Sequence, residues 1–168
     1  MSFAMLALRR VHLPQDNVGR ILRFADGSTA RVFRETRVDV APPSDPCLLV
    51  VAFTLRLVSG PAHRLFEVES VLNTPLFVGF PGLVSKLWCA HDSNGVYRGV
   101  YEWDGPQSAQ RYASSLWRVL EIGCVPGSIR YHVVPGLTRD QVLVEPALLS
   151  VVAGESAADA WWCLTGSS

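Results

Sequence analysis

Four aromatic side chains lie in one segment of the chain, Gly82 to Trp103, with the sequence GLVSKLWCAHDSNGVYRGVYEW. Rings that line a pocket bind flat aromatic molecules by stacking and burial, and a few polar groups among them orient the ligand. The candidate substrate-binding residues are therefore the rings of this segment, the single lysine of the chain and two nearby rings: Trp88, Tyr97, Trp103, Phe77, Tyr112 and Lys86.

Three further side chains, His132, Asn73 and Tyr101, are candidates for catalysis. Proton removal from a bound ligand needs a base that takes up the proton and donors that hold the resulting anion. We take His132 as the base, because the ordinary pKa of histidine lies close to neutral pH. Asn73, Tyr101 and Lys86 are the candidate donors. The competing interpretation is structural, because single rings commonly fill a core and a histidine in a strand is commonly a packing or interface residue.

Other chemistries lack their motifs in this sequence. There is no GxGxxG, no phosphate-binding loop, no GxSxG and no HExxH. The four cysteines, Cys47, Cys89, Cys124 and Cys163, are far apart, and no histidine stands at metal-ligand spacing from them. We therefore expect no metal and no cofactor. Cysteines without a disulfide pattern are typical of the cytoplasm, where we expect the protein to be located.

Charge and hydropathy exclude two classes of partner. The 168 residues include 15 basic and 15 acidic side chains, so the net charge is zero. Without a strong field we expect binding neither to nucleic acid nor to an anionic membrane. The arginines among residues 1–40 are interpreted as a solvated strand face. No apolar stretch is long enough to span a membrane, and the apolar run at the N-terminus is too short for a secretory signal.

The rings share one face of a sheet if Asn94 and Gly95 form a two-residue turn between two strands. Asn-Gly favours a type I′ hairpin because both turn residues need a positive φ. Side chains alternate along strands, so counting outwards from this turn places the rings on one face around two small residues. The predicted pairs are Trp88–Tyr101, Lys86–Trp103, Ala90–Gly99 and Asp92–Tyr97. The floor of Ala90 and Gly99 leaves room for a flat ligand or a covering helix.

The elements around this hairpin follow the ferredoxin-like order. The predictions in chain order are a strand that is buried on both faces (47–57), a helix (61–73), the two hairpin strands on either side of Asn94-Gly95 within Gly82 to Trp103, a second helix (106–122) and a last strand (128–134). This βαββαβ order predicts an α+β fold with a four-stranded antiparallel sheet and both helices on one face. The expected domain division is 1–46, 47–136 and 137–168.

Two extensions flank this core. Residues 19–38 read as a hairpin that turns at Asp26-Gly27, with Ile21 opposite Val32 and neither face cleanly apolar, so we expect it at the periphery. Residues 139–153 predict a short helix interrupted at Pro146, and Trp161 and Trp162 are exposed unless they dock. The sheet face away from the helices needs a cover, for which a second copy of the chain is the economical choice. The alternative cover is the N-terminal hairpin or the C-terminal segment.

The segment Leu72 to Tyr112 resembles the small bacterial mono-oxygenases of the YdhR type, in the dimeric α/β-barrel superfamily. The resemblance consists of a Pro81-Gly82 helix end, a strand of the form SKLW, a G-x-Y-x-G-x-Y-x-W return strand and a helix opened by an acidic residue and proline. It covers about residues 47–136 and implies a homodimer with a pocket between the sheet and its own helices. Relatives include cofactor-free oxygenases of aromatic polyketides, haem-degrading enzymes, cyclases and isomerases.

These observations predict a protein that binds a small aromatic or polyketide-like molecule and acts as a cofactor-independent mono-oxygenase. One alternative is a non-catalytic dimerisation or ligand-binding module of the same fold. A second alternative is a cyclase or isomerase that acts on a similar substrate. An open cavity over Ala90 and Gly99 with a titratable side chain at its wall would favour the enzyme, and a filled core there would favour the module.

Overall fold

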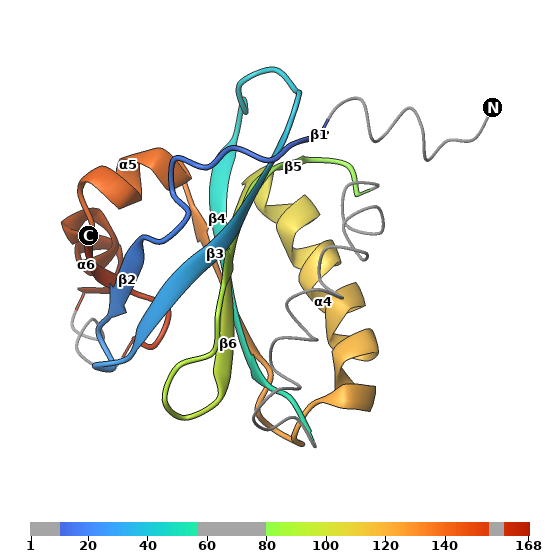
Figure 1. The fold of residues 1–168 in the computed structure, drawn as a ribbon. Helices are drawn as coiled ribbons and strands as arrows, with labels where there is room; N and C mark the ends of the chain where they lie inside the picture. Colours follow the sequence, from blue (N-terminus) through green and yellow to red (C-terminus); the bar gives the residue numbers. More distant parts are fainter. Residues whose placement is uncertain (1–10, 57–79, 155–159) are drawn as a thin grey trace.

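The computed structural model describes residues 11–56, 80–154 and 160–168. These residues form eight strands and three helices around one sheet (Figure 1). The strands are β1 (Val11–His12), β2 (Ile21–Phe24), β3 (Thr29–Val38), β4 (Pro46–Thr54), β5 (Leu83–Cys89), β6 (Val96–Asp104), β7 (Arg130–Pro135) and β8 (Leu164–Ser167). The helices are α4 (Pro106–Gly123), α5 (Arg139–Val144) and α6 (Ala147–Ala153). None of the described helices is long and apolar enough to cross a membrane.

The ferredoxin-like core is present in the sheet. Its strands lie in the order β7-β4-β6-β5, all neighbours being antiparallel, which is the arrangement expected of a βαββαβ unit. The prediction of a four-stranded sheet is wrong, because the sheet continues through β3, β2 and β8, and β1 also pairs with β3. The predicted helix at residues 61–73 lies outside the described residues.

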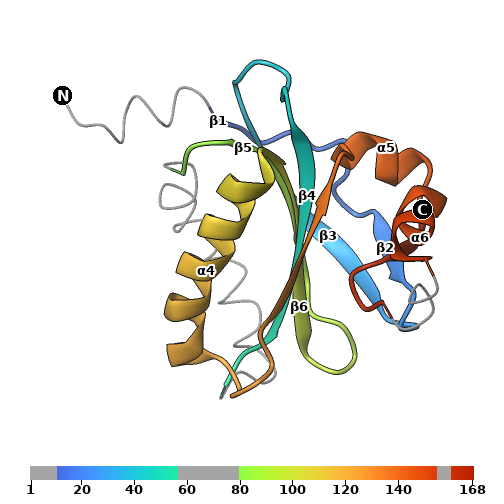
Figure 2. The same cartoon turned by 180° about the vertical axis from the view of Figure 1, so that it is seen from behind.

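Strand β4 runs through the middle of the molecule and is buried on both faces, as its continuous apolar sequence predicts. Its side chains alternate between two cores. Cys47, Leu49 and Val51 pack on the side of α4, while Leu48 and Val50 pack on the opposite side. The two cores therefore meet at this strand, with α4 on one side and α5 and α6 on the other, as both views show (Figures 1 and 2).

The β5–β6 turn differs from the predicted two-residue type I′ turn. The loop has three residues, 93–95, because the amide of Asp92 donates to the carbonyl of Val96 and the amide of Gly95 donates to the carbonyl of Asp92. Gly95 has a φ of 75°, as a glycine at the end of such a loop requires. Asp92 Oδ1 also accepts the amides of Asn94 and Val96, which fixes the longer loop.

The observed pairing register of β5 against β6 therefore differs from the predicted register by two residues. Trp88 lies opposite Gly99 and Lys86 opposite Tyr101, where the two-residue turn predicted Tyr101 and Trp103 as their partners. One residue of the change comes from the loop. The other comes from an extra residue on the β5 side between the Cys89–Arg98 pair and the loop. Because side chains alternate with a period of two, the predicted rings stay on one face.

The N-terminal hairpin makes the same three-residue turn, and here the prediction fails. The amide of Phe24 donates to the carbonyl of Ser28, and Ile21 lies opposite Arg31 instead of Val32. A change of one residue exchanges the faces of one strand. The hairpin consequently has a cleanly apolar face, which is buried in the core away from α4 and consists of Leu22, Phe24, Ala30 and Val32. The hairpin is therefore part of the core and not peripheral.

The sheet face away from α4 is covered by the chain itself. The predicted helix at residues 139–153 is interrupted at Pro146, as expected, and forms α5 and α6. Leu149, Trp162 and Leu164 pack with the N-terminal hairpin in one core cluster. Trp162 is buried in this cluster, so of the two predicted outcomes, exposure or docking, it docks. The prediction that a second copy of the chain covers this face is wrong, because the N-terminal hairpin and the C-terminal segment cover it within one chain. A homodimer stays a prediction without an assigned face.

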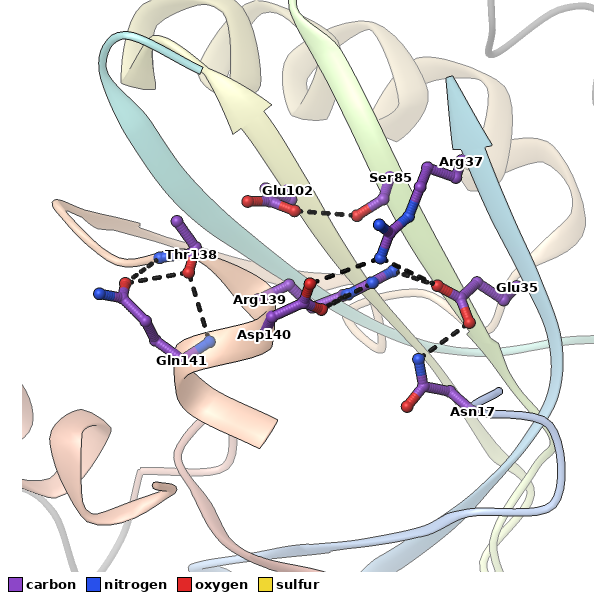
Figure 3. A network of polar contacts seen from close by, with 9 residues as sticks. All are labelled: Asn17, Glu35, Arg37, Ser85, Glu102, Thr138, Arg139, Asp140 and Gln141. Atoms are coloured by element: carbon purple, nitrogen blue, oxygen red, sulfur yellow. Dashed lines mark hydrogen bonds and ion pairs between the residues drawn. The ribbon is translucent and has the colours of Figure 1, made fainter. Parts of the chain in front are cut away.

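A buried network of charged side chains attaches α5 to this face (Figure 3). Arg139 Nη1 lies 2.7 Å from Glu35 Oε1, and both side chains are 1% exposed or less. Asn17 Nδ2 donates to the other oxygen of Glu35 at 2.9 Å. Arg37 lies 3.6 Å from Glu35 and 3.4 Å from Asp140, at the solvent side of the network. The network joins the N-terminal loop, β3 and α5, which are distant in the sequence.

Candidate functional site

The α4 side of the sheet gathers most of the predicted rings. Helix α4 begins at Pro106, whose missing amide is tolerated there, and presents Ala109, Tyr112 and Ala113 to the sheet. The ring centre of Tyr112 lies 4.9 Å from that of Trp103 and 5.4 Å from that of Tyr101. The hydroxyl of Tyr112 donates to that of Tyr101 at 3.4 Å. The predicted placement of Tyr101, Trp103 and Tyr112 next to one another therefore agrees with the structure.

The predicted hollow floor at Gly99 is occupied by a neighbouring ring. A Cβ atom added at Gly99 would lie 2.7 Å from Cε2 of Tyr101, which is closer than carbon atoms approach without a shift. Glycine at this position thus leaves room for the Tyr101 ring and not for a ligand over Gly99. The rest of the ring cluster lies at its outer edge, on β5 and β3.

Lys86 is the titratable group at that edge. Its side chain is 5% exposed, and its Nζ lies 3.0 Å from the centre of the Trp88 ring and 4.5 Å from that of Tyr101. Burial, with a smaller contribution from the positive charge of Arg34, lowers the pKa of Lys86 well below its ordinary value. The lowered pKa weakens the ammonium form, which is the form that the predicted role of Lys86 as a hydrogen-bond donor requires.

Arg34 and Thr36 of β3 complete this cluster, and sequence reasoning missed both. The pairing of β3 with β5 shifts between Val32 and Arg34, so the extra residue Phe33 turns Arg34 and Thr36 to the α4 side. Trp88 Nε1 donates to Thr36 Oγ1 at 2.9 Å. Arg34 Cζ lies 5.1 Å from the centre of the Trp88 ring. The interpretation of the N-terminal arginines as a solvated face is wrong for Arg34, which is 9% exposed.

Trp103 and Tyr97 occupy different surroundings on the same face. Trp103 is fully buried, and its Nε1 has no hydrogen-bond acceptor among the residues that the structure describes. Tyr97 is buried near the β5–β6 turn, where its ring stacks on Phe53 at 5.7 Å and meets the ring of His91 at 5.5 Å. The other two predicted residues, Asn73 and Phe77, lie outside the described residues.

His132 lies on the opposite side of the sheet. It stands opposite Val50 of β4, whose side chain belongs to the core away from α4. Its ring stacks on Trp162 with 4.0 Å between ring centres and an angle of 11°. Burial lowers the pKa of His132 below its ordinary value. The sheet separates His132 from Lys86 and Tyr101, so the structure does not bring the predicted base to the predicted donors.

Two cavities formed by described residues lie away from the cluster. One of about 520 Å³ runs along the outer side of α4 from Phe80 to Arg118. The other, of about 330 Å³, lies between the β2–β3 and β5–β6 turns, where Arg98 bridges Asp92 at 2.8 Å and Asp26 at 3.3 Å. Neither is lined by Lys86, Trp88 or Tyr101.

Nucleophile and metal chemistry find little support in the described part of the chain. No group of three or more histidine, cysteine or acidic side chains among these residues is placed to hold a metal ion. All four cysteines are buried and free. Burial raises the pKa of Cys47 and of Cys89 to about 12, so neither thiol is activated.

Comparison with known proteins finds structural similarity at low identity. No known family and no curated protein matches the sequence. An uncharacterized ferredoxin fold protein from Listeria monocytogenes, described as related to antibiotic biosynthesis monooxygenases, has 11% identity and a TM-score of 0.46, and the match covers 76% of this chain and 92% of that one. A monooxygenase-like protein from Listeria innocua has 13% identity and a TM-score of 0.44, with 79% and 99% covered.

An anthrone oxidase-like protein has 12% identity and a TM-score of 0.43. Its match covers 66% of this chain and only about half, 54%, of that protein. Similarities of this size assign no family to the chain, and the resemblance to YdhR-type mono-oxygenases stays a prediction. The ferredoxin-like description of this protein rests instead on its own strand order, β7-β4-β6-β5, with α4 across one face.

Proposed function

We propose that the chain binds a small aromatic or polyketide-like molecule on the α4 side of the sheet and acts as a cofactor-independent mono-oxygenase. The observation that carries this proposal is the burial of Lys86 between the rings of Trp88 and Tyr101. A buried amine with a lowered pKa among rings has the two properties that the reaction needs, a base and an apolar aromatic contact surface.

The proposed reaction can be written for an anthrone. A base removes a proton from the methylene carbon, and the electrons of the broken C–H bond stay on the ring system as an anion. The anion gives one electron to O₂, and the resulting radical pair combines to a peroxide anion at the same carbon. The protonated base returns its proton to this anion, which gives the hydroperoxide. Loss of water across the remaining C–H and O–O bonds gives the quinone. One anthrone and one O₂ thus yield one anthraquinone and one H₂O.

A non-catalytic ligand-binding module is the second candidate. It is favoured by the ring of Tyr101, which fills the floor at Gly99, and by the packing of Tyr112 on Tyr101 and Trp103. A cyclase or isomerase is the third candidate, because the same proton removal by Lys86 would serve a reaction that does not use O₂.

Oxygen consumption with the hydroxyanthrone dithranol tests the oxygenase directly. Equal amounts of O₂ consumed and quinone formed, above the uncatalysed background, would support it. Lys86→Met should lower the rate by about 100-fold or more if the amine acts as a general base. Arg31→Met, which changes an exposed basic residue of β3, the strand that pairs with β5, is the matched control. Binding of dithranol without turnover would identify the module instead.

A further inference from the structure

The outer side of α4 bounds the larger of the two cavities described above, of about 520 Å³, which is within the usual range of about 300–1,000 Å³ for small-molecule sites. With 3.6 residues per turn, the α4 residues that line it lie opposite the stripe that packs on the sheet. These residues are Ser108, Gln110, Arg111, Ser114, Ser115 and Arg118. Phe80 and Pro81 line the cavity near the start of the helix, where the neighbouring Gly82 approaches Ser108. The cavity therefore lies on the side of α4 that faces away from the sheet (Figure 2).

This face of α4 carries positive charge without an acid beside it. Arg111 and Arg118 are exposed and stand two turns apart, about 10.5 Å along the helix axis. An acid three or four residues from an arginine would stabilise such a helix, but the positions between these two arginines hold Ser114 and Ser115. The only acid of α4, Glu121, does not line the cavity. Two long cationic side chains with small hydroxyl side chains between them leave a gap that suits an anion.

Hydrogen-bond donors are available in this gap. Helical side chains lean toward the N-terminus of their helix, so Arg118 extends over Ser114, one turn earlier. Neither Arg118 nor Arg111 forms an ion pair with a residue that the structure describes. Arg111 uses its Nε for a long bond of 3.4 Å to the carbonyl of Gln107, which leaves its Nη groups for a ligand. The hydroxyl of Ser115 already donates to the carbonyl of Arg111 at 2.9 Å. An anion over Ser114 can therefore contact one hydroxyl and two guanidinium groups.

The cavity also has an apolar part. The ring of Phe80, which lies edge-on to Tyr112 with 5.2 Å between ring centres, lines it together with Pro81. The aliphatic stems of the two arginines add apolar surface below their charged ends. We propose that the cavity binds an amphiphilic anion, in which a carboxylate, sulfate or phosphate group over Ser114 is attached to an apolar body that contacts Phe80 and Pro81. This inference goes beyond the proposed function, because the site lies on the side of α4 that faces away from Lys86 and the sheet.

Calorimetric titration with octanoate tests the inference, with octanol as the uncharged probe and inorganic phosphate as the probe without an apolar body. We expect octanoate to bind the native protein about tenfold more tightly than either probe, or better. Arg118→Met should weaken the binding of octanoate about tenfold, because a hydrogen bond to a charged group is lost, and should leave the binding of octanol unchanged. Arg31→Met, which removes an exposed arginine outside the cavity, is the matched control and should change neither affinity.

A second variant blocks the site without weakening the fold. Ser114→Glu places a carboxylate three residues after Arg111 and four residues before Arg118, so both arginines gain a partner within the helix. We expect the thermal unfolding temperature of this variant to equal or exceed that of the native protein. Its affinity for octanoate should nevertheless fall by about tenfold or more, because the carboxylate competes with the ligand for the same guanidinium groups.

Each contrary result overturns a stated part of the inference. Octanoate that binds no more tightly than octanol, or with the same affinity to Ser114→Glu as to the native protein, would show that the arginines do not hold an anion. Phosphate that binds as tightly as octanoate would overturn the apolar part. No binding of octanoate to a native protein that oxidises dithranol would refute this inference and leave the proposed function standing.

Discussion

The buried pair of Arg139 and Glu35 gives a sharp prediction about how the C-terminal segment is held on the sheet. Arg139→Met removes a guanidinium 2.7 Å from the carboxylate and leaves Glu35, 1% exposed, with Asn17 and the half-exposed Arg37. Removing one partner of a buried pair costs about 3–5 kcal/mol, because the other charge stays buried. We expect the lower end of this range, since two polar neighbours of Glu35 remain.

The second ion pair of Arg139 should contribute much less. Asp140 accepts from Arg139 at 2.7 Å but is 62% exposed, and pairs of this kind contribute about 0–1 kcal/mol. Asp140→Asn is therefore the matched control, for which we expect a loss in free energy of unfolding below about 1 kcal/mol. Both changes are measured by urea-induced unfolding followed by tryptophan fluorescence, with the slope of the transition checked for constancy.

A double variant completes the test of this buried pair. Arg139→Met combined with Glu35→Leu removes both charges, so the large loss of the single Arg139 variant should be mostly recovered. The reasoning is refuted if Arg139→Met costs less than about 1 kcal/mol, or if the losses of the two single variants simply add in the double variant. Either result would mean that α5 is held on the sheet by its apolar contacts alone.

Three further predictions concern the two faces of the sheet. Burial lowers the pKa of His132 in the folded state, so its contribution to stability is present above pH 6.5 and is lost as pH falls through the folded-state pKa. His132→Gln should therefore reduce the pH dependence of the thermal unfolding temperature between pH 5 and 8. The same pH dependence in the native protein and in the variant would contradict this. Gly99→Ala should cost about 1–3 kcal/mol because its Cβ meets the Tyr101 ring; urea unfolding measures it, and a loss below 0.5 kcal/mol would contradict the packing. Lys86→Met should raise the unfolding temperature, since a buried amine is replaced by an apolar side chain of similar length; a lowered temperature would show that the amine stabilises the fold.

The arrangement of the core could be predicted from the sequence because the signals there are strong and local. The continuous apolar run of β4, the Pro106 helix start and the stripe of Ala109, Tyr112 and Ala113 each have one structural interpretation. The rings of β5 and β6 were placed on one face correctly although the predicted register was wrong. That agreement depended on an even register change, which preserves the face of every side chain.

The errors share a physical cause, which is that single extra residues in strands and turns leave no clear trace in the sequence. A three-residue loop at Asp26-Gly27 exchanged the faces of one strand, and the extra residue Phe33 turned Arg34 and Thr36 toward α4. The face of the sheet on which His132 lies depends on the pairing of β7 with β4, which no local sequence pattern encodes. Polar residues in an irregular strand therefore deserve to be considered on both faces.

A crystal structure with bound 4-nitrophenol tests the location of the site most directly. The account predicts the phenol on the α4 side of the sheet, with its oxygen within about 3.2 Å of Lys86 Nζ and its ring against Trp88 or Tyr101. The same crystal form without the ligand serves as the reference. A phenol bound beside His132 and Trp162, or in the cavity along the outer side of α4, would contradict the central claim that the ligand binds beside Lys86.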